Sequence, residues 1–262
     1  MKLVIDKICK DFTNNRGQAL SVLQDIELTV NKEEFVALVG PSGCGKSTLL
    51  NIASGLLQPT SGAVKFTEVD EGYEPRMSIV FQETGLFPWR NVHDNIAFGL
   101  ETAGMPAAQR EERIKHYIEL VGLKGFEKSF PHQLSGGMRQ RVGIARALAI
   151  EPDLLLMDEP FSALDAQTRT IMQEELVTLW EKTRLTTLYV THNIQEAVML
   201  ADRVVLLSRR PGRVSKILTI GIPRADRDKP EHAEAVAEFI RIIWEHISKD
   251  ARAALMEVEN NG

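Results

Sequence analysis

Apolar residues are distributed along the chain in two alternating patterns. Short apolar runs bounded by glycine or polar residues are typical of strands buried on both faces of a parallel sheet; they cover residues 35–39, 78–82, 154–157, 187–191 and 204–207. Between them, apolar residues recur every three or four positions, as on one face of a helix, over residues 109–121, 142–150 and 166–184. Strands that alternate with helices predict an α/β fold.

The two ends of the chain have patterns of their own. Apolar and polar residues alternate over 3–8 and 26–30, which predicts short strands joined through a polar turn at 11–17. The polar stretch 63–76 predicts a hairpin-like segment. At the other end, the charged, proline-bearing residues 221–230 indicate a connector, and a closing helix with one apolar face follows at 236–251.

Domain organisation follows from the order of these patterns. The chain has 262 residues, of which 44% are hydrophobic, and this is enough to bury a substantial core in one domain with a subdomain. The mostly helical stretch 92–150 lies between two strand-rich parts. We predict a main domain over residues 1–220, a helical subdomain within it at about 88–150, and a C-terminal connector and helix over 221–262.

Composition excludes several classes of protein. The formal net charge of −5 does not favour nucleic acid as a partner. No apolar run approaches the ~20 residues that span a bilayer, and the first residues become polar too soon for a signal peptide. We therefore expect a soluble, cytoplasmic chain. The two cysteines, Cys9 and Cys44, do not indicate a disulfide framework or a metal site.

A glycine-rich motif between the run 35–39 and a helical segment carries the most specific chemistry. It matches G-x-x-x-x-G-K-[ST] at all eight positions, which are Gly40, Pro41, Ser42, Gly43, Cys44, Gly45, Lys46 and Ser47. In such a loop the backbone N–H groups surround a phosphate, the lysine reaches the β- and γ-phosphates, and the serine hydroxyl can bind Mg²⁺. An ordinary glycine-rich turn is the alternative, but the complete match favours a nucleoside triphosphate site.

Polar side chains end three of the predicted strands. Asp158 and Glu159 follow the run 154–157, where Asp158 can hold Mg²⁺ and Glu159 can orient or deprotonate a water molecule. Gln82 ends the run 78–82 and is either a ligand of Mg²⁺ or water, or a turn residue. His192 follows the run 187–191; a lone histidine there is usually structural, but the neighbouring motifs favour contact with a γ-phosphate.

Two further features have two readings each, and a third carries one expectation. Ser135, followed by Gly136 and Gly137, is either a second anion-binding helix start or an ordinary helix cap. Phe12 stacks on an adenine ring or belongs to the core. Cys44 lies at a helix start, where the pKa of a thiol tends to fall, so we expect alkylation that ATP slows.

Taken together, these motifs resemble those of the ATP-binding-cassette ATPases, the nucleotide-binding subunits of transporters, over residues 1–220. The phosphate loop, Gln82, the segment 134–137, Asp158-Glu159, Asp165 and His192 occur in the order and approximate spacing of that family. The resemblance implies a P-loop NTPase (RecA-like) core with an antiparallel β subdomain and a helical signature subdomain. It also implies a head-to-tail dimer of two copies that clamps ATP and Mg²⁺.

The resemblance assigns roles residue by residue. Catalysis would involve Glu159 as base, His192 at the γ-phosphate, Lys46 and Gln82. Mg²⁺ would be held by Ser47, Gln82 and, through water, Asp158. ATP in one copy would contact Phe12, Gly40, Pro41, Ser42, Gly43, Cys44, Gly45, Lys46, Ser47, Thr48, Gln82 and Asp158. Across the dimer it would meet Ser135, Gly136, Gly137, Met138 and Asp165, with Met138 in place of the glutamine of many cassettes.

A finer resemblance is to the importer branch for nitrate, sulfonates and taurine. It is carried by the stretches 86–89, 158–165, 201–208 and 211–214, while Asn193 departs from the usual aspartate. It implies a permease partner, an extracytoplasmic solute-binding protein, and a location on the inner face of the cell membrane. Rival readings are an exporter or lipid transporter, a cassette acting on nucleic acid or ribosomes, and a small-molecule kinase, which would not account for the segment 135–137.

Overall fold

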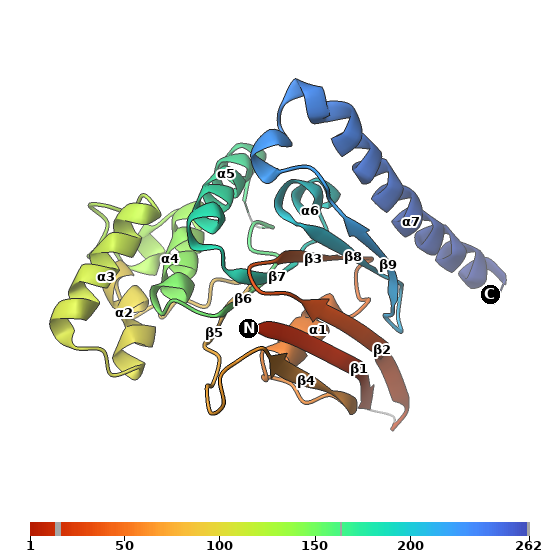
Figure 1. Cartoon of the computed structure of the whole chain (residues 1–262), viewed down its shortest axis with the longest axis horizontal. Helices are drawn as coiled ribbons and strands as arrows, with labels where there is room; N and C mark the ends of the chain where they lie inside the picture. The colour runs from red at the N-terminus through yellow and green to blue at the C-terminus, as the bar shows by residue number, and fades with distance from the viewer. Residues whose placement is uncertain (14–16, 163, 261–262) are drawn as a thin grey trace. The chain divides into compact units, whose positions relative to one another are not determined.

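The computed structural model describes residues 1–13, 17–162 and 164–260, with side chains up to Lys249. The chain divides into two compact units (Figure 1). Unit 1 contains Met1–Tyr73 and Thr186–Gly262, and unit 2 contains Glu74–Leu185. The fold is α/β, as the alternation of strands and helices predicts.

Unit 1 begins with an antiparallel sheet in the order β2-β1-β4. Its strands are β1 (Lys2–Thr13), β2 (Ala19–Val30) and β4 (Ser61–Thr67). The prediction of short strands is wrong, because β1 and β2 have 12 residues each. The predicted hairpin at 63–76 is also wrong, because β4 pairs with β1. Part of the predicted polar turn, residues 11–13, continues β1, and residues 14–16 lie outside the described part.

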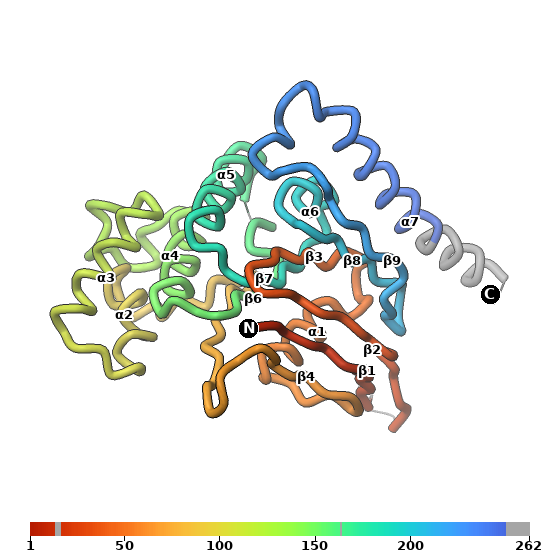
Figure 2. The backbone as a smooth tube through the Cα atoms, in the orientation of Figure 1, coloured from red at the N-terminus to blue at the C-terminus, as the bar shows by residue number. Residues whose placement is uncertain are grey.

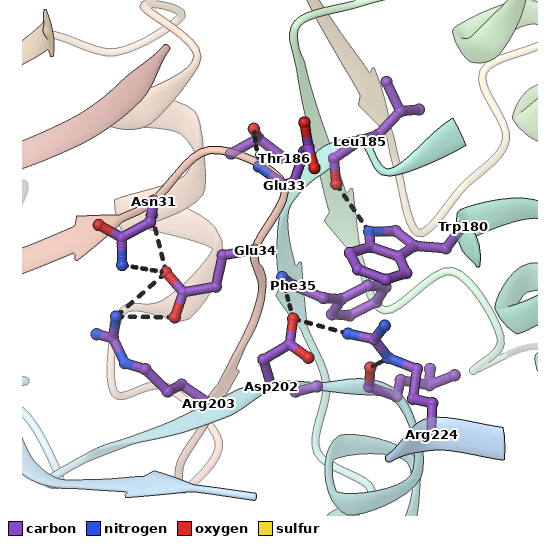
Figure 3. A network of polar contacts seen from close by, with 12 residues as sticks. Asn31, Glu33, Glu34, Phe35, Trp180, Leu185, Thr186, Asp202, Arg203 and Arg224 are labelled. Atoms are coloured by element: carbon purple, nitrogen blue, oxygen red, sulfur yellow. Dashed lines mark hydrogen bonds and ion pairs between the residues drawn. The ribbon is translucent and has the colours of Figure 1, made fainter. Parts of the chain in front are cut away.

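The second sheet of unit 1 carries the phosphate loop. Its strands within this unit follow the order β7 (Thr186–Val190), β3 (Phe35–Val39), β8 (Arg203–Leu207) and β9 (Val214–Thr219). β3 is parallel to both β7 and β8, and its five residues are buried. The start of β3 is pinned by polar contacts: Arg203 donates to Glu34 at 2.9 Å, and Asp202 accepts from the backbone N–H of Phe35 at 2.8 Å (Figure 3).

Two helices follow these parallel strands directly, α1 (Lys46–Ala53) after β3 and α6 (Ile194–Leu200) after β7. The carboxyl ends of parallel neighbours lie at the same edge of a sheet. The turn after β3 and the turn after β7 are therefore neighbours. The phosphate loop lies in the first of these turns and His192 in the second, although the two are far apart in the sequence.

Unit 2 combines one parallel strand pair with helices. β5 (Met77–Val80) pairs with β6 (Leu154–Asp158). The helices are α2 (Val92–Thr102), α3 (Ala107–Leu120), α4 (Gly136–Ala149), α5 (Ala166–Thr183) and the short 3₁₀ helix η1 (Pro131–Gln133). Ile114 on α3 and Val142 on α4 are fully buried, so these two helices pack through the apolar stripes that the sequence pattern indicates, and Ile96 on α2 is fully buried as well.

The C-terminal connector is tied to the end of α6. It contains η2 (Arg224–Asp226) and η3 (Pro230–His232) and leads into α7 (Ala233–Asn260); Figure 2 follows the chain from β9 through it. Arg227 is only 3% exposed and donates to the carbonyl oxygens of Val198, Met199 and Ala201. Arg224 donates to the carbonyl of Leu200. These are the carbonyls that a helix leaves unpaired at its C-terminus.

Burial lowers the pKa of Arg227 to about 10, with the neighbouring Arg224 charge adding to the effect, so its guanidinium stays charged at neutral pH. The sequence pattern predicts only a charged connector here and misses this anchor.

Within the described part of the chain, every helix is too short or too polar to cross a bilayer.

We expect Arg227→Ala to lower the free energy of unfolding by about 3 kcal/mol, because several buried carbonyls lose a charged donor. Urea denaturation followed by tryptophan fluorescence measures this. The matched control is Arg241→Ala, which removes an exposed arginine paired with Glu238 and Glu245 on α7. The control should show no measurable change, and equal losses in both variants would contradict the anchoring role.

Candidate functional site

The loop between β3 and α1 has a backbone that only glycine tolerates at two points. Gly45, the N-cap of α1, has φ 104°, and a Cβ there would lie 2.6 Å from the Leu23 side chain. A Cβ on Gly40 would lie 2.8 Å from the carbonyl oxygen of Leu207. Both glycines let the backbone pack tightly against β2 and β8.

Lys46 places a positive charge inside this loop. The residue is 7% exposed, and its Nζ donates to the carbonyl oxygens of Gly40 at 2.9 Å and Pro41 at 3.1 Å. A buried ammonium group surrounded by backbone dipoles and next to a helix N-terminus suits an anion with several oxygens. The loop therefore fits the phosphates of a nucleotide. Ser47 is exposed in the first turn of α1.

The turn at 208–213 supports the phosphate loop from behind. The backbone N–H of Gly212 donates to Val22 at 2.8 Å, and the N–H of Gln24 donates to Gly212 at 2.9 Å. A Cβ on Gly212 would lie 2.2 Å from the carbonyl oxygen of Cys44. Gly212 is buried in this turn. The Pro-Gly pair before β9 is the one local sequence signal that the backbone at Gly212 comes close to that of Cys44.

The prediction of a reactive Cys44 is wrong. The thiol is buried, and burial raises its pKa, an effect that the charge of Lys46 opposes but does not overcome. The start of α1, which would lower the pKa of the thiol, does not compensate for the effect of burial, because the thiol points into protein rather than water. Alkylation that depends on ATP is therefore no longer expected.

His192 lies in a turn that follows one sheet of unit 1, and Phe12 lies in a strand of the other sheet. His192 is exposed on the turn between β7 and α6, beside the turn that follows β3. Phe12 lies near the end of β1, opposite Leu20 on β2, and is 40% exposed. Assignment of Phe12 to the core is therefore wrong. The Lys10 ammonium nitrogen lies 5.0 Å from the centroid of the Phe12 ring. Stacking of this ring on an adenine stays the prediction.

In unit 2, polar residues follow the ends of the two paired strands. Asp158 is the last residue of β6 and is buried, and Glu159 comes next. Gln82 lies two residues beyond β5 and is exposed. Because β5 and β6 are parallel neighbours, the structure brings these side chains to one edge.

Glu159 has an unusual backbone. Its φ of 45° is left-handed, a conformation that costs a residue with a side chain about 1–3 kcal/mol. The turn is held by Ser162, whose backbone N–H and hydroxyl both donate to the carbonyl oxygen of Glu159. Six other described non-glycine residues also have a positive φ, so this conformation does not by itself mark a functional residue.

The second glycine-bearing segment is a capped helix start, as predicted. Ser135 is the N-cap of α4, and its hydroxyl accepts from the backbone N–H of Met138 at 3.2 Å. A Cβ on Gly137 would lie 3.0 Å from the Thr168 methyl group. Thr168 in turn donates to Asp165, the N-cap of α5, through its N–H and hydroxyl, and these bonds lower the pKa of Asp165. The structure thus brings Asp165 beside the segment 135–138; Ala163 lies outside the described residues.

A glycine loop with a lysine at its centre, set after a buried parallel strand and before a helix, defines a P-loop nucleotide-binding protein. Residues 23–162 match the family model described as ABC transporter. A solved dimeric ATP-binding cassette, in a post-hydrolysis state with ADP and Pi, is 30% identical with a TM-score of 0.73, covering 84% of this chain and 100% of its own.

Relatives over nearly the full length agree. An uncharacterised ABC transporter ATP-binding protein of Methanocaldococcus jannaschii is 46% identical, covering 96% of this chain and 95% of its own. The nitrate import ATP-binding protein of Synechococcus elongatus is 45% identical, covering 90% of this chain and 85% of its own. The taurine import ATP-binding protein of Yersinia pestis is 49% identical, covering 78% of this chain and 80% of its own. The chain therefore belongs to the ABC transporter family and is one of its ATPases.

Proposed function

We propose that this chain is the ATP-hydrolysing subunit of an ABC importer that drives uptake of a small anionic solute, of the nitrate, sulfonate or taurine type, through a membrane permease. The observation that carries the ATPase chemistry is the Lys46 ammonium group inside its glycine loop. The importer assignment is supported by the relatives that are named for nitrate and taurine import.

ATP binds with its β- and γ-phosphates in the loop, where Lys46 and the backbone N–H groups neutralise charge. Phe12 stacks on the adenine. Among the described residues no group of three or more His, Cys, Asp or Glu side chains could hold a metal ion alone. Ser47, Gln82 and Asp158 would hold Mg²⁺ together with phosphate oxygens, and their oxygen donors suit this ion. When bound, Mg²⁺ draws negative charge from the phosphates.

Hydrolysis uses one water molecule. Its oxygen attacks the γ-phosphorus, the bond from that phosphorus to the β–γ bridging oxygen breaks, and ADP leaves. Glu159 orients the water and accepts its proton, while His192 contacts the γ-phosphate. The strained backbone of Glu159 and the capped turn at Ser162 support a fixed direction for this carboxylate.

A second copy completes the site. The helix start at Ser135, Gly136, Gly137 and Met138, together with Asp165, reaches the ATP of the opposite copy. ATP therefore favours a closed dimer and ADP an open one, so that each hydrolysis step resets the population. The dimeric cassette with ADP and Pi, to which this chain is similar, supports the assembly.

The permease contact is assigned to an aromatic surface of unit 2, formed by Phe87, Trp89 and Phe98. Trp89 is 72% exposed, and the Phe87 and Phe98 rings lie 4.7 Å apart. Asn95 is buried and bonded to both the N–H and the carbonyl of Phe87, so the loop is fixed on α2. A fixed apolar surface a few residues after Gln82 in the chain suits a protein partner and links ATP state to the permease at the inner face of the membrane.

Glu159→Gln should retain ATP binding, lower turnover by about 10²–10⁴-fold because the base is lost, and accumulate an ATP-bound dimer. Phosphate release and size-exclusion chromatography with Mg-ATP measure the two effects. Glu174→Gln, an exposed carboxylate on α5, is the matched control and should behave as the unchanged protein. Phosphate release at the normal rate from the Glu159 variant would remove this residue from the mechanism.

Replacing Phe87 and Trp89 together by Ala should abolish solute transport by the reconstituted complex while leaving ATP affinity unchanged, because the aromatic surface contacts the permease and not the nucleotide. Solute uptake into proteoliposomes and nucleotide binding are measured on the same preparation. Trp244→Ala, which removes an exposed tryptophan from α7, is the control. Normal uptake by the double variant would refute the assigned contact.

Isolation of the chain from membranes with its natural partners tests the direction and cargo of transport. We expect a permease and an extracytoplasmic solute-binding protein to accompany it, and calorimetry should show that the latter binds nitrate, taurine or an alkyl sulfonate. Recovery of a transporter that works without any solute-binding protein, or of ribosomes or nucleic acid, would contradict the importer assignment.

A further inference from the structure

A carboxylate is buried directly behind the turn that carries His192. Glu196 lies in the first turn of α6 and is 5% exposed. One of its oxygens, Oε2, accepts from the Thr191 hydroxyl at 2.7 Å and from the Tyr189 hydroxyl at 3.0 Å. Burial of a carboxylate is expensive unless it is hydrogen-bonded, so these two donors explain how it is tolerated but not why it is there.

Ordinary helix capping does not account for Glu196. It is the third helical residue after the N-cap Asn193, the position from which a glutamate accepts from the N–H of the N-cap residue. Here the N–H of Asn193 donates instead to the Thr191 hydroxyl oxygen at 3.0 Å. The carboxylate turns inward, toward β7.

The bonds form a closed ring around one residue. Glu196 accepts from Thr191, Thr191 accepts from the N–H of Asn193, and the Asn193 side chain accepts from the N–H of Glu196 at 3.2 Å. Both chain neighbours of His192 are thereby fixed, and His192 itself is exposed between them. The amide of Asn193 supplies this cap without adding a second negative charge beside Glu196.

We propose that Glu196 is the positioning residue of His192: through Thr191 and Asn193 it sets the direction of the imidazole toward the γ-phosphate. This inference rests on the role of His192 in the proposed function. A histidine on an unrestrained turn reaches its target in only a fraction of its conformations, and misplacement by about 1 Å costs up to ~10²-fold in rate.

The test is steady-state ATP hydrolysis and nucleotide binding by the full chain in its membrane complex. Glu196→Ala and Thr191→Val should each lower kcat on the order of tenfold with ATP affinity changed less than about twofold. Glu196→Gln should restore most of the rate, because its amide oxygen can accept from both hydroxyls. Gln195→Ala, at an exposed position of the same helical turn, is the control and should leave kcat unchanged.

A double variant separates positioning from general stability. If Glu196 acts through His192, then Glu196→Ala combined with His192→Ala should be no slower than His192→Ala alone. Multiplied losses, a normal kcat in Glu196→Ala, or a parallel loss of ATP affinity would overturn the inference. Should Glu196→Ala not fold, Thr191→Val, which keeps the shape of the side chain, carries the same comparison with His192→Ala.

The two possible failures can be told apart. Normal turnover in His192→Ala would refute the role of the histidine in the proposed function, and the inference with it. Slow turnover in His192→Ala together with normal turnover in both Glu196→Ala and Thr191→Val would refute the positioning role alone.

Discussion

The ammonium group of Lys46 is the constraint on which the rest of unit 1 depends. Carbonyl dipoles neutralise a buried positive charge only in part, so the loop around it gains most when phosphate oxygens share the space. Phosphate oxygens can share this space only if the backbone of the loop comes close to them. The loop therefore packs against Leu23, Leu207 and the Gly212 turn, and its glycine positions have no room for side chains. The nucleotide site is thus built by backbone packing as much as by the motif itself.

The same logic extends to the helix after His192. α6 is held at its start by Asn193 and Glu196, and at its end by the guanidinium groups of Arg224 and Arg227. A helix fixed at both ends moves as one body. The turn that carries His192 and the C-terminal connector are therefore attached to a single helix, although they are far apart in the chain.

How much could be predicted from the sequence depends on how far apart in the chain the interacting residues lie. The phosphate loop, the helix cap at Ser135 and most of the buried runs are local features, and the structure has them; the run 78–82 is the exception, because its strand ends at Val80 and residues 81–82 are exposed. The partner of β4, the burial of Gly212 and the anchor at Arg227 depend on contacts between distant residues, which one sequence does not reveal. The same holds for Cys44: the helix start argues for a low thiol pKa, whereas burial decides the opposite.

The arginine anchor also bears on where the chain can be shortened. Composition suggests a boundary near residue 220, and a protein ended there would keep every nucleotide-binding motif. It would also remove the charged donors from the carbonyls of Val198, Met199 and Ala201, and so loosen the helix that begins beside His192. Residues 224–227 are thus a structural part of unit 1 rather than the start of a detachable tail.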